Sequence, residues 1–176
     1  MYTLRELEKH DLSIINRWRN NPDLIQYLAA PYRYIAPVID ERWYENYLAN
    51  RDTCVRCSII NDNGDLLGLV SLLNIDSINR SATFGIMIGD ENNCESGAGT
   101  YAIKYILKHA FLNLNLNRVE LGVLANNSRA IHVYEKCGFI YEGTKRSSVY
   151  KNGEYLDLKQ YAILKDEYLK NEGLND

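Results

Sequence analysis

Residues 102–124 read AIKYILKHAFLNLNLNRVELGVL, and this stretch decides the fold. Its first half is apolar at the i, i+3, i+4, i+7, i+8 and i+11 positions of a helix packed on a sheet, namely Ile103, Ile106, Leu107, Ala110, Phe111 and Leu114. Its second half, Arg118 to Leu124, is typical of a strand. Because another strand is expected from Ala82 to Ile88, the sequence predicts a central strand–helix–strand unit in a mixed α/β fold.

The flanking sequence supplies the other expected elements. Asn61 to Asp65 contain an Asn-Gly pair, which is typical of a hairpin turn. The expected strands are 2–7, 53–60, 66–74, 139–150 and 155–164, and the expected helices are 10–21, 38–50 and 127–137. The order is βααβββαβαββ. Since no linker, repeat or low-complexity segment interrupts the chain, we expect residues 1–176 to form a single domain.

The composition narrows the class of protein. The chain has 176 residues, 46% of them hydrophobic and 24% charged, which is typical of a globular domain. Its formal net charge is −3 and its basic residues cluster only in pairs, so we expect no nucleic-acid partner. The charged N-terminus does not resemble a signal peptide, and no apolar run is long enough to cross a membrane. We therefore expect a cytoplasmic protein.

The four cysteines do not indicate a metal or redox site. Cys54 and Cys57 have the spacing of a ligand pair but fall at an expected strand, where an odd separation sends their side chains to opposite faces. No second pair and no group of histidines accompanies them. We expect reduced thiols and no bound metal.

A glycine turn precedes the long helix. Residues 97–102 read GAGTYA, which formally match a dinucleotide fingerprint. Eight residues, Gly89 to Ser96, separate this turn from the preceding strand, whereas a dinucleotide fold needs its glycines in the strand-to-helix turn itself. A P-loop is excluded because no Gly-Lys-Ser/Thr follows. Two interpretations stand at this point, a phosphate-binding helix start or a tight helix entry.

A second motif lies in residues 125–143, ANNSRAIHVYEKCGFIYEG. Its asparagine, alanine, tyrosine and Gly-Phe pair, together with SGAGTYA upstream, resemble the GNAT superfamily of N-acetyltransferases. Nearly the whole chain is similar to its ribosomal-protein, polyamine and amino-sugar acetyltransferases. The resemblance implies an α+β fold with a mixed central sheet of about seven strands and about four flanking helices. It also implies acetyl-CoA as cosubstrate and transfer of its acetyl group to a primary amine.

The resemblance assigns site residues position by position. The pantetheine arm would follow the strand at Ile86, Met87 and Ile88. The pyrophosphate would be bound by backbone N–H groups of Cys94, Glu95, Ser96, Gly97, Ala98, Gly99 and Thr100. Asn127 and Ala130 would contact the cofactor, and Tyr134 would be the general acid towards the departing sulfur. Cys94 and Glu95 depart from the family pattern, because relatives often carry Gln or Arg at the start of this loop.

The proposed role of Tyr134 is physically reasonable. Asn127 and Tyr134 are two helical turns apart and share a face. A tyrosine has a reference pKa of about 10 and a thiol about 8.5, so complete proton transfer in water would cost roughly 2 kcal/mol. We therefore expect Tyr134 to donate a hydrogen bond as charge collects on sulfur. The alternative is a core tyrosine on an amphipathic helix.

The general base is less clearly indicated. Many relatives place a glutamate on the strand before the glycine turn, where this chain has Thr83. An amine is mostly protonated at neutral pH, so a proton acceptor is needed. Glu120 is the candidate base, acting directly or through water. The alternative is an exposed strand carboxylate with no catalytic role.

The acceptor amine is predicted from residues 16–51, which contain five arginines, four acidic residues and several interleaved aromatic side chains. This composition favours a partly anionic, planar acceptor such as a nucleotide-linked amino sugar. A polyamine or a protein N-terminus stays open as the alternative acceptor, and a homodimer is a further expectation. Outside acetyl transfer, the alternatives are a dinucleotide-dependent oxidoreductase and a non-catalytic acetyl-CoA sensor.

Overall fold

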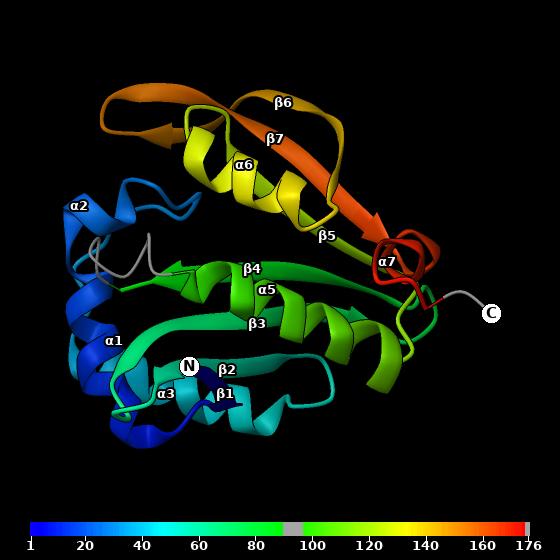
Figure 1. Cartoon of the computed structure of the whole chain (residues 1–176). Coiled ribbons are helices and arrows are strands. Elements are labelled where there is room, and N and C mark those ends of the chain that lie inside the picture. Colours follow the sequence, from blue (N-terminus) through cyan, green and yellow to red (C-terminus); the bar gives the residue numbers. More distant parts are fainter. Residues whose placement is uncertain (90–96, 175–176) are drawn as a thin grey trace.

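A computed structural model describes residues 1–89 and 97–174 of the chain. Its centre is a seven-stranded sheet with the order β1-β2-β3-β4-β5-β7-β6 (Figure 1). The strands are β1 Tyr2–Glu6, β2 Val55–Asn61, β3 Leu66–Asp76, β4 Ser81–Ile88, β5 Arg118–Leu124, β6 Ile140–Lys151 and β7 Glu154–Leu164. Strands β4 and β5 are parallel neighbours, and the other neighbouring pairs among the described strands are antiparallel.

Helices cover both faces of this sheet (Figure 1). The main core lies under α5, where Ile103, Ile106 and Phe111 pack with β3, β4 and β5. A smaller cluster on the other face joins Ile15 of α1 and Tyr47 of α3 to the sheet. The helical segments are η1 Lys9–Asp11, α1 Leu12–Arg19, α2 Pro22–Ile25, α3 Pro37–Ala49, α5 Ala98–Lys108, the π-helical turn η2 His109–Asn113, α6 Ser128–Lys136 and α7 Lys165–Asn171.

The predicted fold class is confirmed, and the strand–helix–strand unit is β4–α5–β5 with parallel strands. The predicted helix number of about four is too low, because the described residues form six α-helices. The expected helix 10–21 is followed directly by an unpredicted one, α2, which begins at Pro22, with the Asn21 side chain accepting from the Asp23 N–H. The C-terminal α7 was also missed. Both helices are too short to show an apolar period.

Cys54 and Cys57 lie on opposite faces of the sheet, as their odd separation predicts. Cys57 packs against the core under α5, whereas Cys54 packs with the cluster on the opposite face. Burial raises the pKa of the Cys57 thiol to about 11, so this thiol is unreactive at neutral pH. Cys54, Cys57 and Cys137 are free thiols, and Cys94 lies outside the described residues.

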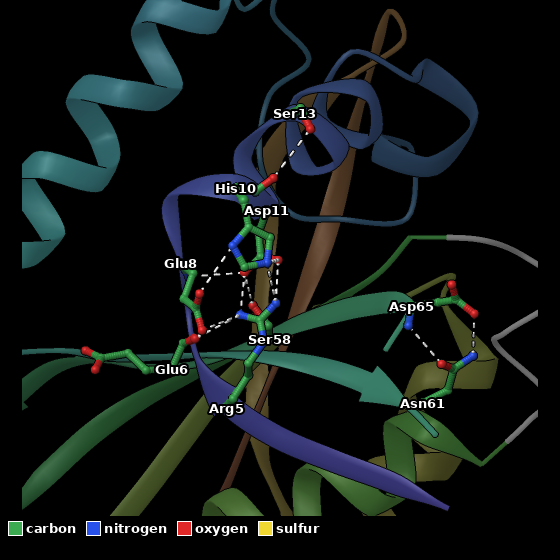
Figure 2. Close-up of polar contacts among 9 residues, drawn as sticks. All are labelled: Arg5, Glu6, Glu8, His10, Asp11, Ser13, Ser58, Asn61 and Asp65. Carbon is green, nitrogen blue, oxygen red and sulfur yellow. Dashed lines mark hydrogen bonds and ion pairs between the residues drawn. The ribbon is translucent and has the colours of Figure 1, made fainter. Parts of the chain in front are cut away.

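A buried carboxylate joins the first helices to the sheet (Figure 2). Asp11 is 1% exposed and accepts from both terminal nitrogens of the Arg5 guanidinium, at 2.7 and 2.8 Å. The Ser58 hydroxyl donates to it at 2.7 Å and the Glu8 N–H at 3.1 Å. Burial raises the pKa of Asp11, but the Arg5, Ser58 and Glu8 hydrogen bonds outweigh it and hold this pKa below the ordinary value.

We predict that Asp11→Asn lowers the free energy of unfolding by about 2–3 kcal/mol at neutral pH, because Arg5 loses its buried partner. Since the pKa of Asp11 is lowered by folding, this contribution is complete above about pH 4 and is lost as the pH falls through the folded value. Urea unfolding at neutral and acidic pH should show the difference between the variant and the wild type shrinking in acid.

The matched control for this measurement is Asp62→Asn, which removes an exposed ion pair with the N-terminal amine. Exposed ion pairs contribute little to the free energy of unfolding, so the unfolding midpoint of the control should match that of the wild type. A difference between Asp11→Asn and the wild type that stays constant down to acidic pH would contradict this role of Asp11.

Candidate active site

The site originates in a split between two parallel strands. Ser81 to Thr83 pair with Arg118 to Glu120, and beyond these three positions β4 and β5 separate (Figure 1). The other edge of β4 stays paired with β3, and that of β5 with β7. The edges that face each other therefore have no strand partner between Phe84 and Ile88 or between Leu121 and Leu124. Backbone groups on such edges are free to bind an extended ligand.

A cavity of about 470 Å³ lies in this split. It is lined by the segment 24–30 with Leu24, Tyr27, Leu28, Ala29 and Ala30, by Leu73, by β4 and β5 with Phe84, Gly85, Ile86, Ile88, Leu121, Gly122, Val123 and Leu124, and by α5 and α6 with Gly97, Gly99, Thr100, Ile103, Asn127, Arg129, Ala130, Val133 and Tyr134. Two helix starts thus meet the open ends of two strands. This is an arrangement that suits an elongated ligand carrying phosphates.

The cavity opens towards both faces of the sheet. Phe84, Leu121 and Val123 belong to the core under α5, so they face α5 and α6. Gly85 and Gly122 alternate with them and therefore face the layer of α1 and α3. The space that a Cβ would take at Gly85 is empty, whereas at Gly122 the side chains of Leu158 and Gln160 lie 3.0 to 3.3 Å from that position, so the open space on this face lies beside Gly85.

The start of α5 forms one end of the cavity. Gly97 has a φ of +88°, which favours glycine, and it is the residue from which the helix begins. Gly97, Gly99 and Thr100 line the cavity, and no acidic residue lies in the first turn of the helix. Ala98 is fully buried and does not line the cavity. The first-turn N–H groups and the helix dipole suit an anion.

Part of the predicted pyrophosphate loop cannot be assessed, because Cys94, Glu95 and Ser96 lie outside the described residues. On β4, Ile86 and Ile88 line the cavity as predicted for the pantetheine arm. Met87 points away and packs with the α1–α3 cluster. Because Met87 pairs with Leu69 and Gly89 donates to Leu67, the alternating ladder directs the Met87 backbone to β3, and the backbone groups of Ile86 and Ile88 face the split.

Asn127 connects two walls of the cavity. Its side-chain oxygen accepts from the Ala130 N–H at 3.1 Å and caps α6. Its amide nitrogen donates to the Tyr27 carbonyl at 3.2 Å. Asn127 and Ala130 both line the cavity, where cofactor contacts are predicted for them. The observed contacts add a second role for Asn127, since it joins α6 to the segment after α2.

Tyr134 reaches the cavity from the middle of α6. Its ring packs edge-on against Phe84 and Phe139, with both centroid distances at 5.9 Å. Burial raises the pKa of Tyr134 to about 12, and the nearby Cys137 adds to the shift. The phenol is therefore protonated at neutral pH and can donate a hydrogen bond into the cavity. This geometry suits the predicted role towards a departing sulfur.

Glu120 does not lie in the cavity, where a general base for the amine is expected. It precedes the split, does not line the cavity, and its carboxylate pairs with Arg118 at 3.1 Å. Arg118 also pairs with Glu142 of β6, so the three side chains form one exposed network. A carboxylate held in this way is poorly placed to take a proton from an amine in the cavity. We therefore do not assign the base to Glu120.

The sequence reasoning missed the segment that follows α2. Leu24, Tyr27, Leu28, Ala29 and Ala30 form one wall of the cavity. Lys151 at the end of β6 holds this segment in place, through hydrogen bonds described below. No sequence motif indicates Lys151 or the segment after α2, because the contact between them joins residues more than 120 positions apart. Arg129, the charged side chain on the described lining, was also missed, although it lies inside the α6 motif.

Two features are absent from the described residues, a metal-binding group and a membrane-spanning helix. No group of three or more His, Cys, Asp or Glu side chains in 1–89 and 97–174 is arranged to hold a metal ion. Within the same residues, no helix has the length and apolar character needed to cross a membrane.

Comparison with known proteins agrees with this geometry. Residues 2–140 match the family model described as the acetyltransferase (GNAT) domain. The chain is 36% identical over 169 residues to a spermidine N(1)-acetyltransferase of Vibrio cholerae, covering 95% of each chain. It is 32% identical over 167 residues to the spermidine N(1)-acetyltransferase of Escherichia coli K12, covering 94% of this chain and 87% of the relative.

A solved structure is similar over the same length. The spermidine N-acetyltransferase from Vibrio cholerae, in complex with CoA and spermine, has a TM-score of 0.89 to this chain at 33% identity, covering 96% of this chain and 98% of that one. The chain therefore belongs to the GNAT family of acetyltransferases. It is an N-acetyltransferase with acetyl-CoA as cosubstrate, so the predicted family, activity and cosubstrate are confirmed. The oxidoreductase alternative was wrong.

We predict that a large side chain at Gly99 weakens acetyl-CoA binding. A Cβ built there meets no atom within 4 Å, so Gly99→Leu should extend into the cavity without a clash. It should weaken acetyl-CoA binding by about tenfold or more, because the side chain takes space next to the helix start. Leucine favours a helix more than glycine does, so the melting temperature should not fall. Calorimetric titration would measure the affinity, with Gly99→Ala as the smaller matched change. Unaltered affinity in the leucine variant would mean that this turn is structural.

Tyr134→Phe should lower kcat by about 100-fold, the range of a lost general acid, with little change in acetyl-CoA affinity. The matched control is Tyr161→Phe, which also removes a buried hydroxyl, here one bonded to Glu135 and away from the cavity. Steady-state kinetics of CoA release would separate the two variants. Equal kcat in Tyr134→Phe and the wild type would remove this residue from the mechanism.

Proposed function

We propose that the acceptor is a polyamine such as spermidine or spermine, which acquires an acetyl group on a primary amine. Similarity to spermidine acetyltransferases over almost the whole chain supports this acceptor. The observation that carries the proposal is the apolar wall formed by Leu24, Leu28, Ala29, Ala30 and Leu73. The methylene chain of a polyamine can pack on such a wall, whereas the hydroxyl groups of a sugar would lose their hydrogen bonds to water there.

The arginines of residues 16–51 do not support the amino-sugar acceptor that their number led us to expect. None of them lines the cavity. Arg19 pairs with Asp40 and lies over the Trp43 ring, and Arg51 pairs with Glu6. Arg19 and Arg51 stabilise the packing around α1 and α3, and Trp18, Trp43, Tyr44 and Tyr47 belong to the same packing, whereas Tyr27 lines the cavity and Tyr34 is exposed. The number of arginines in the sequence was therefore a misleading indicator of an anionic acceptor.

The proposed reaction places each partner on one side of the split. The cofactor lies along the open edges of β4 and β5, with its phosphates at the start of α5, while the amine approaches from the segment after α2. An apolar wall disfavours an ammonium ion, so the amine loses its proton before attack. Its nitrogen then bonds to the thioester carbonyl carbon and releases a proton to solvent, while the carbon–sulfur bond breaks. The sulfur takes the proton of the Tyr134 hydroxyl and leaves as the CoA thiol, and solvent returns a proton to Tyr134.

A free-thiol release assay with acetyl-CoA tests the acceptor class directly. We expect kcat/KM for spermidine and spermine to exceed that for amino sugars, nucleotide-linked amino sugars and N-terminal peptides by at least about 100-fold, a difference of nearly 3 kcal/mol. Mass spectrometry of the product would show one added acetyl group. Preference for a nucleotide-linked amino sugar, or for a peptide N-terminus, would contradict the proposal.

A further inference from the structure

Lys151 is a buried cation at the end of β6. It is 7% exposed, and its ammonium group donates to the carbonyls of Ile25, at 2.7 Å, and Ala30, at 2.8 Å. It also donates to the Leu28 carbonyl. An ammonium group has three N–H donors, so these carbonyls use all of them. The side chain therefore binds one short segment at three points.

The partners of Lys151 differ from those of Asp11 and Asp40, the other charged residues that are buried among the described ones. Arg5 and Arg19 each pair with a buried aspartate, whereas Lys151 has no carboxylate within ion-pair distance among the residues that the structure describes. Burial lowers the pKa of Lys151, which measures the cost of keeping this charge away from water. A buried lysine without an acid is uncommon in proteins, so a specific task is a reasonable inference.

The segment that Lys151 holds is the apolar wall of the active-site cavity. Leu24, Tyr27, Leu28, Ala29 and Ala30 line the cavity, and the carbonyls bound by Lys151 lie within the same stretch. After α2 ends at Ile25, this stretch has no strand or helix of its own before α3. Its shape therefore depends on side chains from elsewhere in the fold.

A second side chain, from another element, holds the same segment. The Asn127 amide donates to the Tyr27 carbonyl, between the carbonyls that Lys151 binds. Asn127 begins α6, the helix that carries Tyr134. The wall is thus fixed both to the end of β6 and to the helix with the candidate general acid.

We propose that Lys151 is a positioning residue, which fixes the segment 25–30 so that this wall holds the acceptor amine in line with the thioester. The proposal rests on the polyamine function proposed above. Lys151 acts through the wall and has no contact with the reacting atoms. Small displacements of a bound amine reduce the rate of attack strongly, so a wall that is free to move should bind spermidine poorly and misplace it.

The test compares Lys151→Met, Lys151→Arg and a matched control, Lys145→Met. Methionine keeps the length of the side chain and removes the ammonium group, whereas arginine keeps the charge and the donors. Lys145 is an exposed lysine of the same strand. We expect Lys151→Met to raise the KM for spermidine by about tenfold or more, with acetyl-CoA affinity within about twofold of the wild type. Arginine should restore part of the loss, and the control should behave as the wild type.

Hydrogen exchange gives a second measurement on the same variants. The amides of Ile25, Gln26, Tyr27 and Leu28 donate within the α2 turn, so their exchange reports how firmly the wall is held. Faster exchange should be found there in Lys151→Met and not in the control. If the methionine variant does not fold, Lys151→Gln, which keeps one donor group, is read in the same way.

The outcomes separate this proposal from the one on which it rests. No turnover of spermidine by the wild type contradicts the polyamine function. Normal wild-type turnover, with an unchanged KM for spermidine in Lys151→Met, contradicts the positioning role. A solely structural role would lower the melting temperature and the fraction of enzyme that binds acetyl-CoA, but it would leave the KM for spermidine unchanged in the folded fraction.

Discussion

The separation of β4 from β5 is the constraint on which the rest of the site depends. The two strands are parallel and pair over three positions, which is enough to continue the sheet but leaves their carboxyl ends apart. Their outer edges are fully paired with β3 and β7, so the separation does not weaken the sheet on either side. Unpaired edges are a liability in most proteins, because they invite pairing with other chains. Here they face a cavity, where a ligand can use them.

The split also explains how the two helix layers take part in one reaction. Side chains of β4 and β5 that face α5 and α6 are large, such as Phe84 and Leu121, and they support the helix starts and Tyr134. Between them, Gly85 leaves open space towards the other layer, whereas the position of Gly122 is covered by Leu158 and Gln160 of β7. The cofactor and the acceptor can therefore approach each other from opposite sides of the sheet, with Tyr134 on the side of the cofactor.

The sequence predicted the parts of this arrangement that are local. The α5 period and the strand after it were evident in residues 102–124, and the α6 motif marked Asn127 and Tyr134. The amino-sugar prediction rested on composition, which does not show which side chains face a cavity, and similarity to spermidine acetyltransferases supports the polyamine alternative better. Arg19 and Arg51 are held by Asp40 and Glu6, contacts that only the folded chain reveals.

The surroundings of the expected base, Glu120, and the apolar wall after α2 likewise could not be predicted from local sequence. Glu120 was the best-placed carboxylate in the linear sequence, yet the network with Arg118 and Glu142 depends on how β6 and β7 return to the sheet. Lys151 and the segment after α2 are joined across more than 120 residues, and neither carries a pattern that indicates the other. Long-range contacts of this kind build the wall after α2, whereas local motifs mark the starts of α5 and α6.

We propose that acetyl-CoA binds along the unpaired edges of β4 and β5. Backbone hydrogen exchange with and without acetyl-CoA, resolved to single residues, would show whether it does. We expect the cofactor to slow exchange in Phe84–Ile88 and Leu121–Leu124 and at the start of α5, while β1 and β2 exchange as before. Protection elsewhere in the chain, with unchanged exchange along both edges of the split, would contradict it.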